Sequence, residues 1–184
     1  MRIILCRWNE EGKVCFSEEA FPDPNVLEWR GVTVFGELCA DGSLRPEAMK
    51  LFSKVRKMAD ADDDKAQLLL IGDGLVETAR DYFAYGIDRV YVYDDLMLTE
   101  PDPELYGQML THFIDNYKPA AILFPESPLA AYLQTLIMDY AIAKGNELTA
   151  TTYTETLTPV PIQDRGKRGE LVICEIPDIN QLRR

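Results

Sequence analysis

Two short loops hold the residues of this 184-residue chain that are best placed to bind a ligand. Gly72-Asp73-Gly74 follows the apolar run QLLLI, and Pro125-Glu126-Ser127 follows AAILF. A glycine-rich turn before a helix can direct backbone N–H groups at an anion, and a serine before a proline can cap a helix or contact a ligand. However, G-D-G matches no common phosphate-binding pattern, and Asp73 would repel a phosphate. A tight turn capped by Asp73 is therefore favoured over a phosphate cradle.

Residues for acid–base or nucleophilic catalysis are scarce. The only histidine, His112, shares a helical face with Gln108 and Asp115, which predicts a solvated helix residue. Any Ser-His-Asp or Cys-His arrangement would have to be built on it. The pair Asp94-Asp95 follows a strand and could ligate a metal, but such acidic turns are usually solvated. The residues predict no catalytic site and no metal site.

The four cysteines, Cys6, Cys15, Cys39 and Cys174, form no C-x-x-C pair and fit no common zinc spacing. Each lies in an apolar or strand-like segment. The opening residues MRIILCRWNEEGK do not resemble a secretory signal. Together these features predict reduced, mostly buried thiols in a cytoplasmic protein.

Composition excludes several classes of function. The chain has 19 basic and 31 acidic residues, a net charge of -12 and 47% hydrophobic residues. No apolar run approaches the roughly 20 residues of a membrane helix, so membrane insertion is not expected. An acidic surface repels phosphate backbones, which disfavours nucleic-acid binding.

The elements that position the two loops alternate between strand and helix. Strands are expected at 31–38, 67–71, 88–95 and 120–125, and helices at 46–60, 75–85, 104–117 and 127–145. This alternation, with short continuous apolar runs, predicts an α/β fold with a three-layer parallel sheet of Rossmann-like topology. Ligands of such sheets bind beyond the carboxyl ends of the strands.

The chain divides into three regions by sequence character. We expect an N-terminal hairpin and loop extension at 1–30, an α/β domain at 31–150, and a small antiparallel β appendage of the same domain at 151–184. The extension holds both tryptophans, Trp8 and Trp29, which could serve either a partner interface or a local core.

From Val34 onward the chain resembles the N-terminal domain of electron transfer flavoprotein alpha subunits. The resemblance is carried by VFGELCADGSLRPEAMKLFSKVRKMAD, LLLIGDGLVETARDYFAYGIDRVYVYDD, YKPAAILFPES and GNELTATTYTETL in that order. It covers roughly residues 31–176 and implies an adenine nucleotide alpha hydrolase-like topology.

The resemblance implies a flavin-free scaffold in an electron-transfer system. In that family FAD is held mainly by a second, C-terminal domain, and the alpha subunit pairs with a beta subunit of related fold. FAD is thus expected at the level of a complex and not on this chain alone. The implied partners are a beta-like subunit, a separate FAD domain or a flavoprotein dehydrogenase, with a homodimer as a further option.

Two departures from the family pattern matter. The chain ends at Arg184, about where the FAD domain should begin, which would fit a truncation, a natural single-domain relative or a split subunit. The family's fourth helix carries an R-D pair ahead of an A-P-R stretch. Here Gln134 and Thr135 stand at the R-D pair, and Met138 and Asp139 stand where P-R would be, so ordinary subunit contacts would differ. The alternative function is a small AMP- or ATP-binding domain using Gly72, Asp73, Gly74, Pro125, Glu126 and Ser127.

Overall fold

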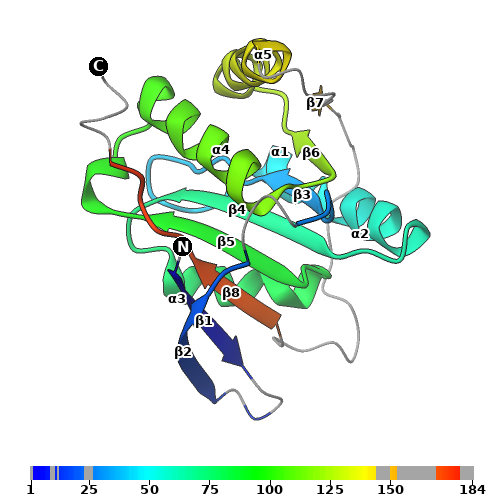
Figure 1. The fold of residues 1–184 in the computed structure, drawn as a ribbon, viewed down its shortest axis with the longest axis vertical. Helices are drawn as coiled ribbons and strands as arrows, with labels where there is room; N and C mark the ends of the chain where they lie inside the picture. The colour runs from blue at the N-terminus through cyan, green and yellow to red at the C-terminus, as the bar shows by residue number, and fades with distance from the viewer. Residues whose placement is uncertain are drawn as a thin grey trace.

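One twisted sheet forms the centre of the molecule (Figure 1). A computed structural model describes residues 2–8, 11, 13–22, 27–143, 150–152 and 169–178. The strands of the sheet are β1 (Arg2–Trp8), β2 (Val14–Ala20), β3 (Val32–Phe35), β4 (Ala66–Gly72), β5 (Arg89–Asp94), β6 (Ala121–Phe124), β7 (Ala150–Thr152) and β8 (Gly169–Ile173). Their spatial order is β2-β1-β8-β5-β4-β3-β6-β7.

The helical elements connect these strands. They are α1 (Pro46–Met49), α2 (Phe52–Ala61), α3 (Val76–Ala79), α4 (Pro103–Tyr117) and α5 (Pro128–Ala143), with short 3-10 turns η2 (Arg80–Tyr85) and η3 (Leu96–Leu98). The predicted helix at 46–60 is divided at Lys50–Leu51, and the predicted helix at 75–85 is completed by η2. Among the described residues, no helix has the length and apolar character needed to cross a bilayer.

The sheet is parallel from β8 through β7, which confirms the predicted α/β class. The chain runs outward from β3 through β4 to β5 and then returns to the other side of β3 with β6. The point where the order reverses therefore lies between β3 and β6, whose strands pair directly. In open α/β sheets this is where a crevice forms at the carboxyl ends.

Alternating side chains of the central strands build two cores, one on each face. In β4, Leu69 and Ile71 pack against α4 and α5, whereas Leu68 and Leu70 pack against the side covered by α1, α2 and α3. All four are at most 2% exposed, and burying each side chain contributes about 1.5–3 kcal/mol. The continuous apolar run arises because both faces of the strand are covered.

The N-terminal hairpin is present and extends the sheet. β1 pairs with β2 and with β8, in both cases antiparallel. Figure 1 shows the hairpin at the end of the sheet opposite α5. Trp8 is buried against Phe83, with ring centroids 5.7 Å apart, whereas Trp29 is 39% exposed beside Lys118. Trp8 is therefore part of the hydrophobic core.

The last strands differ from the expected antiparallel appendage. β7 pairs parallel with β6, and β8 inserts between β5 and β1, parallel to β5. The physical reason is burial, since Leu171 contributes to one core and Val172 to the other. A strand buried on both faces belongs in the interior of a sheet. Most of the region 151–184 lies outside the described residues.

Candidate functional site

A cleft of about 950 Å³ opens at the carboxyl ends of β3, β4 and β6, at the reversal of strand order. Its walls come from the loop after β3, the end of β4, the segment from Leu98 to Tyr106, and the start of α5. The volume falls within the range of small-ligand sites, about 300–1,000 Å³. This cleft is the candidate functional site.

Glu37 is the one buried carboxylate of the cleft. Only 6% of the residue is exposed, and it lies two residues after the end of β3. The hydroxyl of Ser127 donates a hydrogen bond to Glu37 Oε2, and Arg45 Nη1 lies 3.5 Å from Oε1. Ser127 Oγ also accepts a hydrogen bond from the Ala130 N–H at 3.0 Å, so it caps α5. The pair therefore fixes the β3 loop to the start of α5.

The sequence prediction placed Ser127 correctly as a helix cap but missed Glu37. A carboxylate that ends a buried strand, as in VFGEL, is the signal that could have found it. A buried charge requires partners, and here Ser127 before α5 and Arg45 before α1 supply them.

The Gly72-Asp73-Gly74 turn is capped from a neighbouring strand. Asp94 Oδ1 accepts the Gly74 N–H at 2.9 Å, and Oδ2 accepts the Leu75 N–H at 3.0 Å. The predicted cap by Asp73 is wrong, because the capping carboxylate comes from the end of β5. Gly74 adopts φ +68°, a conformation that favours glycine. The N–H groups suited to an anion are thus already bound to a carboxylate.

The six residues predicted to bind a ligand are only partly brought together. Gly72 and Asp73 line the cleft, and Ser127 contacts the cleft residue Glu37. Gly74 binds Asp94, as described above. Pro125 is buried and Glu126 exposed, and neither is among the residues lining the cleft. Ligand binding by these residues stays a prediction.

The charge of the cleft is strongly negative. Its walls carry Glu37, Asp41, Asp73, Asp102 and Glu104, and Arg45 is the only cation among the described residues that line it. Hydrogen bonds from the hydroxyl and N–H of Ser43 lower the pKa of Asp41, which keeps it ionised. Phosphate groups would be repelled from such walls.

Tyr106 closes the floor of the cleft. Burial raises the pKa of Tyr106 to about 12, with a further increase from the nearby Glu37 carboxylate. Its hydroxyl donates to the Leu98 carbonyl at 3.2 Å. The phenol therefore stays neutral and structural, and no pair of nucleophile and base is formed here.

His112 lies on the α4 side of the sheet, away from the cleft. Its Nδ1 is 2.7 Å from the Tyr93 hydroxyl, and the residue is half-buried. The expectation of a solvated histidine is therefore wrong, because α4 packs this face against β5. Burial lowers the pKa of His112, so it is neutral near pH 7.

The thiols are distributed differently from the expectation of mostly buried cysteines. All four are unpaired, with Cys6 and Cys174 buried and Cys15 and Cys39 exposed. Cys15 lies in β2, whose outer face has no covering layer, and Cys39 lies in the loop after β3. Among the described residues, no group of three or more metal-binding side chains occurs. Asp95 instead caps η3 by accepting the Met97 N–H at 3.0 Å.

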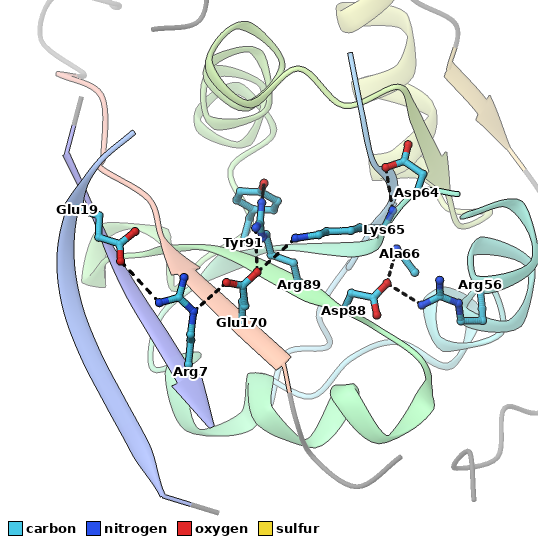
Figure 2. Close-up of polar contacts among 10 residues, drawn as sticks. All are labelled: Arg7, Glu19, Arg56, Asp64, Lys65, Ala66, Asp88, Arg89, Tyr91 and Glu170. Atoms are coloured by element: carbon cyan, nitrogen blue, oxygen red, sulfur yellow. Dashed lines mark hydrogen bonds and ion pairs between the residues drawn. The ribbon is translucent and has the colours of Figure 1, made fainter. Parts of the chain in front are cut away.

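The opposite, amino-terminal edge of the sheet carries an ionic network (Figure 2). Glu170 of β8 accepts from Arg89 at 2.9 Å and from Arg7 at 3.0 Å, and Lys65 lies 3.4 Å away. Burial alone would raise the pKa of Glu170, but its three cationic partners lower it to about 2. The network connects β1, β8, β5 and the start of β4, and we assign it a structural role.

A second branch of this network surrounds Asp88. Its Oδ2 accepts from Arg56 Nη1 at 2.6 Å and from the Ala66 N–H at 2.9 Å. Arg56 also pairs with Asp60 on its own helix. Figure 2 shows these contacts bridging α2 to the first residue of β4. The amino-terminal edge thus carries these ion pairs, whereas the cleft described above lies at the carboxyl edge.

Comparison with known proteins agrees with this topology. Residues 32–138, from β3 into α5, match the family described as "Electron transfer flavoprotein domain". The chain belongs to the electron transfer flavoprotein family. The earlier resemblance to alpha subunits is confirmed by the relatives described next.

Three relatives illustrate the family. The chain is 34% identical over 113 residues to the LctC subunit of lactate dehydrogenase (NAD(+),ferredoxin) from Acetobacterium woodii, covering 61% of this chain and 27% of the relative. It is 30% identical over 99 residues to an electron transfer flavoprotein subunit alpha from Megasphaera elsdenii, covering 54% and 29%. It is 31% identical over 104 residues to the acryloyl-CoA reductase electron transfer subunit beta from Anaerotignum propionicum, covering 56% and 28%. The matched segment thus spans less than a third of each relative.

The cleft does not fit the FAD that the family name implies. FAD carries a pyrophosphate, whereas the cleft presents five carboxylates against one arginine. The N–H groups of Gly74 and Leu75, which could bind a phosphate, are bound to Asp94. No step of flavin chemistry is therefore assigned to the residues of this cleft.

Proposed function

We propose that this chain is an alpha-subunit-like scaffold domain of a cytoplasmic electron-transfer flavoprotein system. It docks a beta-like subunit, a separate FAD domain or a flavoprotein dehydrogenase, and it has no catalytic side chains of its own. FAD belongs to the assembled complex.

The observation that carries this proposal is the family match over residues 32–138. It coincides with the alternating strands and helices from β3 to α5, which include the central strands of the sheet. All three relatives described above are named as subunits, two of them for electron transfer. The cleft supports the non-catalytic part, since it holds carboxylates and a neutral phenol but no nucleophile–base pair.

The exposed face of α5 is a suitable docking surface for a subunit. Tyr132 is 48% exposed and Met138 36% exposed, and Thr135 lies on the same face. Gln134, Thr135, Met138 and Asp139 are the positions at which this helix departs from the pattern that the family resemblance implies. The buried face of α5 carries Leu133 and Ile137, so this helix is apolar on two sides.

The test is assembly with a beta-like subunit. We expect the two purified proteins to elute together in size-exclusion chromatography with light scattering, and the complex to show flavin absorbance that this chain lacks alone. Met138→Glu should weaken the complex, whereas Glu77→Lys, at an exposed position of α3, should not. A chain that stays monomeric and colourless with every beta-like subunit and flavin domain offered would contradict the proposal.

The nucleotide-binding alternative is tested by calorimetry with AMP, ATP and FAD. The cleft lies where a nucleotide would bind in a related α/β fold, but its negative walls oppose the phosphates. We therefore expect no heat at millimolar concentration. Saturable heat with AMP would favour the alternative.

A further inference from the structure

The carboxyl-edge cleft combines an apolar floor with an acidic rim. Leu98 is fully buried at its base, and Leu38 and Leu129 are half-buried in its walls. Tyr132 stands at the rim with 48% of its surface exposed. A cleft lined in this way favours apolar side chains, because each one inserted would be removed from water.

Two rim carboxylates have no counter-charge. Asp73 and Glu104 are both exposed, and among the described residues neither forms an ion pair. Arg45, the one cation that the described part of the chain places in the cleft, is already shared between Glu37 at 3.5 Å and Glu47 at 3.5 Å. The rim thus presents unneutralised negative charge around an apolar floor. That charge attracts cations and discriminates against anionic ligands.

Two exposed apolar side chains lie in the short turn that ends at the cleft residue Leu98. Leu96 and Met97 are 77% and 43% exposed, and they precede Leu98 in the same short turn η3. Large exposed apolar side chains beside a cleft are typical of interaction surfaces. A small cation would use the charge but leave these side chains in water, whereas a peptide segment would use both.

We propose that this cleft is the docking groove for a short segment of a partner polypeptide that carries lysine or arginine beside large apolar side chains. The apolar side chains of the segment pack between Leu38 and Leu129 in the walls of the cleft, above Leu98 at its base. The basic side chains pair with Asp73 and Glu104. The inference rests on the proposed scaffold function, because it names the chemistry of the partner segment that the scaffold binds.

The experiment is a selection from a random 12-residue phage-displayed peptide library on the purified full chain. No clone is removed for binding to other variants, so that an Asp73→Asn/Glu104→Gln double variant remains an independent test. We expect the selected peptides to be enriched in lysine, arginine, leucine and aromatic residues. A selected peptide, synthesised and labelled, should bind the double variant at least about tenfold more weakly than the wild type, since about 1.4 kcal/mol corresponds to a factor of ten.

Matched variants separate the groove from general electrostatics. Asp62→Asn/Glu77→Gln removes the same charge at exposed positions outside the cleft and should leave the peptide affinity unchanged. Tyr132→Ala should weaken binding, whereas Met138→Ala, on the same helix but outside the cleft, should not. All four positions are exposed, so folding is expected to be retained, which circular dichroism checks.

Each outcome decides the inference. Failure to enrich any peptide, enrichment of acidic peptides, or equal loss of affinity in the two double variants would overturn it. Its failure is distinguishable from failure of the scaffold function. If the chain binds no peptide but still assembles with a beta-like subunit, also as the Asp73→Asn/Glu104→Gln variant, the groove proposal alone is rejected. Peptide binding without any subunit assembly would remove the scaffold function and retain the groove.

Discussion

Arg89 Nη2 donates to Glu170 Oε1 across 2.9 Å, and this contact joins the first residue of β5 to the second residue of β8. Both side chains are mostly shielded, with 21% and 24% exposed. The same carboxylate also receives Arg7 from β1. A residue near the C-terminus thus holds the N-terminal hairpin and the central sheet together.

Glu170→Gln should destabilise the fold by about 1–3 kcal/mol. The substitution removes the only anionic partner that Arg89 has among the residues that the structure describes, and it leaves a largely buried cation. Urea unfolding followed by circular dichroism at pH 7 measures the change. Glu19→Gln, which removes the more exposed partner of Arg7 at 3.6 Å, is the control and should change stability by less than about 0.5 kcal/mol. Equal effects of the two variants would contradict a central role for Glu170.

Acid should selectively remove the contribution of Glu170. The pKa of this carboxyl is lowered in the fold from 4.5 to about 2, so the unfolded chain takes up its proton at a higher pH than the folded chain. The stabilisation is therefore complete above about pH 4.5 and is lost as the pH falls towards 2. The difference in unfolding free energy between wild type and Glu170→Gln should shrink between pH 5 and pH 3. A constant difference over that range would argue against the lowered pKa.

Asp94→Ala should destabilise the chain by about 1–2 kcal/mol. The carboxylate accepts two N–H groups of the turn after β4, at 2.9 and 3.0 Å, and alanine leaves both donors without that partner. Asp73→Ala, in the same turn but exposed, should change stability by less than about 0.5 kcal/mol. Thermal unfolding of the two variants side by side measures this contrast. A larger loss from Asp73→Ala would restore the cap that the sequence predicted.

Ser127→Ala should cost about 1–2 kcal/mol, because it removes both the cap of α5 and the donor to the buried Glu37. Thr135→Ala on the same helix is a suitable control, since its exposed hydroxyl only donates to the Ala131 carbonyl at 3.2 Å. Chemical unfolding measures both variants. If Ser127→Ala is as mild as the control, Glu37 has another donor in solution.

Structural features that depend on residues close in sequence were predicted, whereas features that depend on residues far apart in sequence were not. Strand and helix positions were predicted because β4 and α4 carry their periodicity and end signals within a few residues, such as Asp102-Pro103 before α4. The cap of the Gly72-Asp73-Gly74 turn was not predicted, because Asp94 lies 20 residues from Gly74 and is brought beside it only by the pairing of β4 with β5.

The position of β8 was missed for the same reason. ELVICEI predicts a strand from its own residues, but pairing with β5 and β1 is decided by contacts that join distant parts of the chain. Glu170, which lies 81 positions from Arg89, gives no local signal of its role. Glu37 and Ser127, 90 positions apart, were likewise brought together by the strand order alone.

His112 should make the fold less stable as the pH falls through the range in which a free histidine takes up a proton. Burial lowers the pKa of the folded imidazole, while the carboxylates of Glu175 and Asp115 oppose this shift without cancelling it. The unfolded chain therefore binds the proton first, and stability is lost below the ordinary value of 6.5.

The measurement for His112 is urea unfolding of the wild type and His112→Gln between pH 7.5 and 5.5. Glutamine does not titrate and can still bond to the Tyr93 hydroxyl, which lies 2.7 Å from the imidazole. We expect the free energy of unfolding to fall more for the wild type than for the variant over this range, because folding must keep the imidazole neutral whereas the unfolded state holds it protonated. Parallel pH profiles would show that the histidine is as solvated as its helical position alone predicts, and that α4 does not shield it in solution.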